Sequence, residues 1–152
     1  METSVVRELE LAAPLEAVWR HLTDPDRLTS WLAPEAVVEA RPGGRVHCRW
    51  ADGAERVGTV EVADPPRRLR LRWGPPEDGG AAGEDGTPAA TTVEFTLAPV
   101  GAGTLLRVTE AGIRGGLGAQ LCASLSWQGL AGRLARRVAG SGVRSLTAGR
   151  CR

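Results

Sequence analysis

The chain has 152 residues, a formal net charge of +1 and 42% hydrophobic residues. A single domain of this length buries about 68–70% of the surface of its unfolded chain, which is enough for a sizeable core. A net charge near zero gives no general attraction to nucleic acid or to anionic lipid, so we expect neither as a partner. No apolar run approaches the ~20 residues that cross a bilayer, and the N-terminal segment lacks the apolar stretch of a signal peptide. The sequence therefore favours a cytoplasmic protein without a membrane span.

The cysteines and histidines have no spacing typical of a metal site. Cys48 and Cys122 are expected to be small buried side chains, and Cys151 to lie in a frayed tail. We expect His21 to pack on a helix and His47, which alternates with arginines, to face solvent. These patterns predict no metal and no cofactor.

The first 32 residues predict a strand followed by two short helices. Residues 5–11 alternate between apolar and polar side chains, as a half-buried strand does. Residues 13–32 then show helical spacing on both sides of Asp24-Pro25, where Asp24 can cap a second helix that ends near Trp31. A helix pair in this place suggests a lid over one end of a curved sheet, and so a pocket.

Six further strands are indicated by alternation between turn signals. The expected ranges are 35–40, 45–50, 56–62, 67–73, 92–97 and 104–110. Gly43-Gly44 and Asp52-Gly53 are strong turn signals between successive strands, so the strands should form an antiparallel meander. In the third of these strands, Val60 and Val62 are expected on one inward face.

Three other segments complete the predicted domain, which covers residues 1–139. Residues 74–90 lack large apolar side chains and are expected to form a flexible, acidic insertion, either a solvated linker or a flap near a pocket mouth. Residues 117–139 predict a long helix, and residues 140–152 a disordered tail. The helix carries two apolar rows: Leu117, Leu121 and Leu125 in one, and Trp127, Leu130, Leu134 and Val138 in the other.

This order of elements resembles the START/Bet v 1-like superfamily, also called SRPBCC, and within it the activator-of-Hsp90-ATPase-like group. The matching pieces are Ala17-Val18-Trp19, Leu22-Thr23-Asp24-Pro25-Asp26, Trp31, Pro42-Gly43-Gly44, Asp52-Gly53, Gly58, Pro65-Pro66 with Leu69, Gly103-Thr104 and Ser126-Trp127. Two positions depart from the family pattern, since Leu32 replaces a frequent aromatic residue and Ser126 a usual glycine.

The resemblance implies an α+β helix-grip fold, in which a curved antiparallel sheet wraps around a long C-terminal helix, with two short helices after the first strand. It also implies a cavity between the sheet and that helix. Members of the superfamily bind lipids, polyketides, aromatic metabolites and hormones. Some act as polyketide cyclases or aromatases, and a few protect producers of enediyne antibiotics.

Aromatic side chains dominate the candidate ligand site. Alternation places Trp50, Trp73 and Phe95 on the concave face of the sheet and, by the same count, turns Arg56 inward. The candidate ligand-binding residues are Trp31, Trp50, Arg56, Leu71, Trp73, Phe95, Val108, Leu121 and Trp127. For any single tryptophan, plain core packing is the alternative and the more common role.

Glu110 is the candidate catalytic residue. Strict alternation puts it inward beside Leu106 and Val108, where a carboxyl group could transfer protons. The alternative, which the uncertain strand end favours, is a solvated carboxylate beyond the strand.

The function expected first is the binding, carriage or sequestration of an apolar or aromatic small molecule, polyketide- or lipid-like, with antibiotic biosynthesis or self-resistance as a context. A polyketide cyclase or dehydratase comes second and a chaperone-interacting module third. The protein is expected to be a monomer or homodimer.

Overall fold

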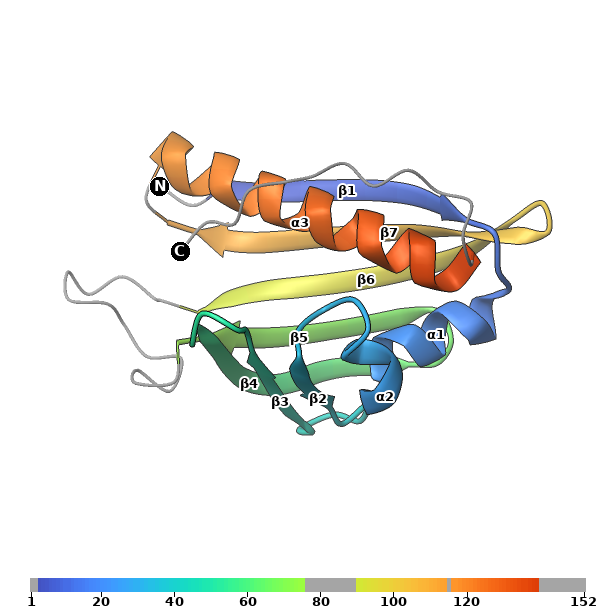
Figure 1. Cartoon of the computed structure of the whole chain (residues 1–152), viewed down its shortest axis with the longest axis horizontal. Coiled ribbons are helices and arrows are strands. Elements are labelled where there is room, and N and C mark those ends of the chain that lie inside the picture. Colours follow the sequence, from blue (N-terminus) through green and yellow to red (C-terminus); the bar gives the residue numbers. More distant parts are fainter. Residues whose placement is uncertain (1–2, 76–89, 115, 140–152) are drawn as a thin grey trace.

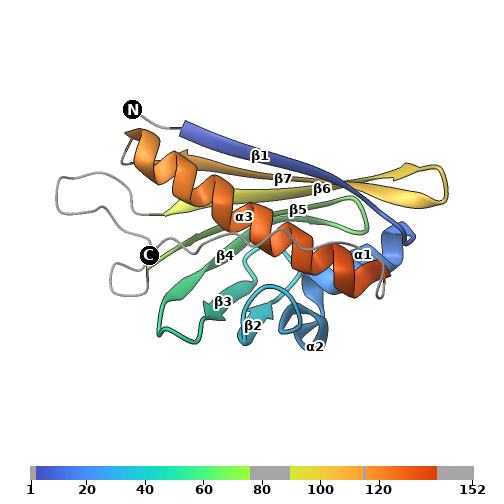
Figure 2. The same cartoon turned by 45° about the horizontal axis from the view of Figure 1, so that its top comes forward.

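The computed structural model describes residues 3–75, 90–114 and 116–139. In chain order the elements are β1 (Thr3–Leu11), α1 (Leu15–Thr23), α2 (Pro25–Leu28), β2 (Glu35–Val38), β3 (Arg45–Arg49), β4 (Glu55–Asp64), β5 (Arg68–Gly74), β6 (Thr91–Val100), β7 (Gly103–Ile113) and α3 (Gly116–Ala139). The strands form one antiparallel sheet in the order β1-β7-β6-β5-β4-β3-β2, and α3 runs obliquely across one face of it (Figures 1 and 2). This is the helix-grip fold that the resemblance to the START/Bet v 1-like superfamily implied. The body of the expected insertion (76–89) and the tail from residue 140 lie outside the described residues.

Cross-strand register collects the inward side chains into rows, because residues paired on neighbouring strands share a face. One row runs from β1 to β4 through Val5, Glu110, Val93, Leu71 and Val60. The neighbouring row on one side contains Arg7, Val108, Phe95 and Leu69. The neighbouring row on the other side contains Thr91, Trp73, Gly58, Val46 and Val38. These rows form the concave face that α3 and the helix pair cover.

A bulge in β4 alters one predicted face. The register shifts between Val60 and Val62, so that Val62 lies opposite Arg70 and Ala63 lies opposite Leu69. Arg70 belongs to the outer face, and Val62 lies there with it. The prediction that Val60 and Val62 share the inward face was wrong for Val62, since the bulge inserts one residue into the alternation.

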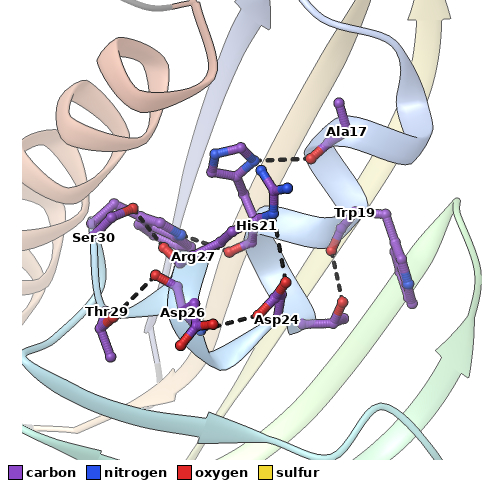
Figure 3. A network of polar contacts seen from close by, with 10 residues as sticks. Ala17, Trp19, His21, Asp24, Asp26, Arg27, Thr29 and Ser30 are labelled. Atoms are coloured by element: carbon purple, nitrogen blue, oxygen red, sulfur yellow. Dashed lines mark hydrogen bonds and ion pairs between the residues drawn. The ribbon is translucent and has the colours of Figure 1, made fainter.

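The helix pair is held by local hydrogen bonds (Figure 3). The Asp24 carboxylate accepts a hydrogen bond from the backbone N–H of Asp26 at 3.0 Å, and Pro25 occupies the first turn of α2, as predicted. On α1, Nδ1 of His21 lies 2.9 Å from the carbonyl oxygen of Ala17. His21 is buried, so the expectation of a packed histidine is confirmed.

Two indole N–H groups hold the helical segment together and attach it to the sheet. Trp31 donates to the carbonyl oxygen of His21 at 2.7 Å, and Trp50, just after β3, donates to that of Leu32 at 3.0 Å. The second bond links the end of the helical segment to the sheet. The Arg137 guanidinium of α3 also donates to this segment, to the carbonyl oxygen of Ser30 at 3.3 Å. The helix pair therefore closes the end of the concave face beside the C-terminal end of α3 (Figure 1).

Only one of the two predicted apolar rows of α3 faces the sheet. Trp127, Leu130 and Leu134 are buried, whereas Leu121 is 54% exposed and Leu125 is 45% exposed. Leu121 precedes Trp127 by six residues, which at 3.6 residues per turn places it about 120° around the helix. The prediction that Leu121 lines an interior site was therefore wrong.

Cys48 is buried as expected, and His47 lies on the outer face of the sheet as expected but is only partly exposed. Cys48 on β3 is fully buried, and burial raises the pKa of its thiol from 9.0 to about 12, so it is not a reactive thiolate. His47, on the outer face of the same strand, lies 3.0 Å from Oε2 of Glu55.

Within the described ranges, no helix is long and apolar enough to cross a membrane.

The close approach of β4 and β5 requires a glycine at position 58. A Cβ atom on Gly58 would overlap the carbonyl oxygen of Arg72 and lie 2.8 Å from Cα of Trp73. Both neighbours are backbone atoms, so no side chain can move aside. In contrast, a Cβ on the exposed Gly118 of α3 would meet nothing within 4 Å.

We therefore expect Gly58→Ala to lower the free energy of unfolding by about 1–3 kcal/mol, because the backbone of β5 must shift. The matched change Gly118→Ala should instead raise it by up to about 1 kcal/mol through helix propensity. Urea unfolding followed by circular dichroism measures both. Equal effects of the two substitutions would contradict the close strand approach.

Candidate functional site

The carboxylate of Glu110 lies at the centre of the aromatic side chains. Its Oε1 accepts a hydrogen bond from the indole N–H of Trp127 at 3.0 Å. Its Oε2 accepts one from the Thr91 hydroxyl at 2.6 Å and one from the indole N–H of Trp73 at 3.3 Å. Glu110 is only 8% exposed. The described residues thus supply three neutral donors to one buried carboxylate.

The length of β7 explains this position. The strand continues to Ile113, which pairs with Thr3 at the start of β1. Glu110 is therefore an internal residue of the strand, opposite Val5 on one side and Val93 on the other. The expectation of a solvated carboxylate beyond the strand end was wrong, and the inward placement given by strict alternation holds.

Four aromatic rings pack against one another beside the carboxylate, and we call them the aromatic cluster. Trp73 and Trp127 are stacked, with ring centroids 6.2 Å apart and an interplanar angle of 20°. Trp50 meets Trp73 edge-on at 6.3 Å, and Phe95 meets Trp127 edge-on at 5.9 Å. The cluster joins α3 to strands β5 and β6 and to the residue that follows β3. Such contacts stabilise a core beyond the area that they bury.

A small closed cavity adjoins the aromatic cluster, with a volume of about 10 Å³. Its lining is entirely apolar: Leu22, Leu28, Trp31, Leu32, Val38, Val46, Leu71, Trp73, Val93 and Phe95. A space of this volume holds at most one water molecule. A larger hollow of about 230 Å³ lies along β3 and β4, bordered by Arg45, Val46, His47, Val57 and Gly58.

The structure brings most of the predicted ligand-binding residues together. Trp31, Trp73, Phe95, Leu71, Val108 and Trp127 are all buried in one core. Arg56 lies opposite the buried Cys48 and therefore on the concave face, as predicted, and is half-buried. Leu121 is the residue of the set that lies on the outer surface.

Thr91 is the member of the site that sequence reasoning missed. It is the first residue of β6, directly opposite Trp73 of β5. Its hydroxyl makes the shortest of the three hydrogen bonds to Glu110. The register of a hairpin with a long connection cannot be read from alternation, and the predicted strand, residues 92–97, begins one residue after Thr91.

The family model described as "Activator of Hsp90 ATPase homolog 1-like protein" matches residues 12–139. The chain belongs to this family. The match covers both helices of the pair, the sheet from β2 to β7 and all of α3. No curated protein matches the chain.

Solved structures with the same fold include proteins from several bacteria. Protein MLL2253 from Mesorhizobium loti is 26% identical with a TM-score of 0.77, covering 88% of this chain and 95% of that one. CalU16 from Micromonospora echinospora is 26% identical with a TM-score of 0.69, covering 90% and 76%. DynU16, a putative protein in the dynemicin biosynthetic locus, is 24% identical with a TM-score of 0.73, covering 88% and 46%.

The bonding at Glu110 predicts that Glu110→Gln destabilises the fold. The amide NH₂ would replace one oxygen, and an indole N–H can only donate. Whichever way the amide turns, either Trp73 or Trp127 loses its acceptor. We expect a loss of about 1–3 kcal/mol in the free energy of unfolding, the cost of an unsatisfied buried donor.

The control is Glu10→Gln on β1, where the side chain is exposed. It should change stability by less than about 0.5 kcal/mol. Chemical unfolding with tryptophan fluorescence measures both variants. If Glu110→Gln were as mild as Glu10→Gln, the carboxylate would not be holding the two indoles.

Proposed function

We propose that this domain binds an apolar or aromatic small molecule between the sheet and α3, at the aromatic cluster. The observation that carries the proposal is the entirely apolar lining of the closed cavity, which continues into stacked tryptophans around a single buried carboxylate. Small-molecule sites commonly combine apolar and aromatic walls with a few placed polar groups. Carriage or sequestration needs no more than this arrangement.

The volume of the cavity sets a condition on binding. About 10 Å³ does not admit a ring compound, so aromatic side chains must turn to make room. Trp73 and Phe95 both line the cavity and belong to the aromatic cluster. Trp31 and Trp50 are fastened to the helix pair. The rings of β5 and β6 are therefore the ones that we expect to move.

A second candidate function is an enzyme of the cyclase or dehydratase kind. The buried Glu110 carboxyl beside an aromatic cavity favours it, since a positioned carboxyl group can transfer a proton to a bound substrate. In that case Glu110→Gln should lower turnover by about 10²–10⁴-fold while substrate still binds. If the domain is a carrier, neither the wild type nor Glu110→Gln would show turnover.

The biological context is a separate part of the proposal, and the two alternatives are antibiotic biosynthesis or self-resistance, and interaction with a chaperone. One structural neighbour comes from an antibiotic biosynthetic locus, and its similarity to this chain supports the shared fold. A chaperone-interacting role has the family description as its support. Native mass spectrometry of the protein purified from its source distinguishes these contexts, because a carrier should retain a metabolite of defined mass.

Binding is tested by titrating the protein with a flat apolar ring compound, 2-methylnaphthalene. We expect a saturable heat of binding in calorimetry and a higher melting temperature, since a ligand that binds only the folded state stabilises it. The variant Leu121→Ser serves as a control for adsorption to the exposed side of α3, and its affinity should match that of the wild type. Non-saturable binding, or binding lost in Leu121→Ser, would argue against an interior site.

A further inference from the structure

Trp73 separates the closed cavity from the carboxylate of Glu110. Its ring lines the cavity, while its N–H reaches Oε2 of Glu110. Val93, another cavity-lining residue, is the direct cross-strand neighbour of Glu110. If the Trp73 ring turned away, the cavity and the carboxylate would therefore share one space.

The bond from Trp73 is the one most easily exchanged. At 3.3 Å it is longer than the Thr91 bond of 2.6 Å and the Trp127 bond of 3.0 Å, and longer than the usual 2.9–3.0 Å. It also shares its acceptor, Oε2, with the Thr91 hydroxyl. A better-placed donor on a bound molecule could replace it without disturbing the bond that holds α3.

The carboxylate of Glu110 favours a ligand that donates a hydrogen bond at Oε2. Glu110 forms no ion pair within the described ranges. The other charged side chains that the strand register places on that face are Arg7 and Arg56. Arg7 is engaged with α3, because its guanidinium donates to the carbonyl oxygen of Ser124 at 3.2 Å and to the Ser124 hydroxyl. A second carboxylate beside Glu110 would be repelled, whereas a hydroxyl or an ammonium group would be bound.

We infer that the ligand of this site is an apolar ring compound bearing a hydroxyl or amine donor, which takes the place of the Trp73 N–H at Oε2 of Glu110. The inference rests on the proposed function and names the chemistry of its ligand. Thr91 and Trp127 keep their bonds to the carboxylate, so that Glu110 remains positioned while Trp73 turns. The ring of the ligand then occupies the enlarged cavity.

The experiment compares four naphthalenes that differ in one substituent: 2-naphthalenemethanol, 2-naphthylmethylamine, 2-methylnaphthalene and 2-naphthoate. Calorimetry gives the dissociation constant of each. We expect the alcohol or the amine to bind about tenfold more tightly than the methyl compound, and naphthoate to bind most weakly. The alcohol and amine arms distinguish a neutral donor from a cation.

The variant Trp73→Phe tests the exchange itself. It keeps an aromatic ring but removes the N–H, so neither compound has to break the bond to Oε2 and both should bind about three- to tenfold more tightly. The affinity ratio of donor compound to methyl compound should stay at about ten, because Oε2 of Glu110 still accepts from the donor compound alone. Because both compounds are measured on one variant, changes in stability or cavity size largely cancel in the ratio. The matched control is Trp19→Phe on α1, outside the cavity lining, where both affinities should equal those of the wild type.

Each outcome separates the inference from the proposed function. If all four compounds bind alike, or if naphthoate binds most tightly, the inference is overturned and the proposed function stands. A ratio near one in Trp73→Phe, or affinities no higher than those of the wild type, would also overturn it. If none of the four binds to the wild type or to Trp73→Phe, the proposed function fails and the inference fails with it.

Discussion

One buried carboxylate connects the parts of this fold. Glu110 on β7 accepts hydrogen bonds from Trp73 on β5, Thr91 on β6 and Trp127 on α3, so three strands and the long helix meet at its two oxygens. The position of Trp127 then determines which side of α3 faces the sheet, and the Arg7–Ser124 contact fastens the same helix to β1. The stacking of Trp73 on Trp127 and the small volume of the cavity both depend on these contacts.

A carboxylate in an apolar interior costs free energy unless its lone pairs are satisfied. Here three neutral donors satisfy them, and each indole N–H needs an acceptor as much as the carboxylate needs donors. An apolar residue could fill the same volume, but it would leave two indole donors without partners. The arrangement is therefore stable as a unit and sensitive to the loss of any member. The same property lets a ligand with a suitable donor exchange with one indole at little cost to the rest.

The spacing of apolar side chains was sufficient to predict most of the fold and part of the site. The alternation of residues 68–73 placed Trp73 inward, and the Asp24 cap and Pro25 placed the start of α2, because both signals act over a few residues. The errors arose where distant segments set the outcome. The bulge in β4 moved Val62 outward, and the sheet covers only one side of α3, which left Leu121 exposed. The inward placement of Glu110 was not the favoured expectation, because the length of β7 depends on its pairing with β1.

The sequence by itself determined the order of the elements, the turns that join them and the inward faces of most strands, since these follow from side-chain spacing and local turn chemistry. Only the tertiary structure decided that Thr91 and two tryptophans, from segments up to 37 residues away from Glu110, converge on one carboxylate. It also decided that the expected pocket is filled by its own aromatic rings. Both outcomes depend on strand register and on the rotation of α3 about its axis, and no local pattern encodes either of them.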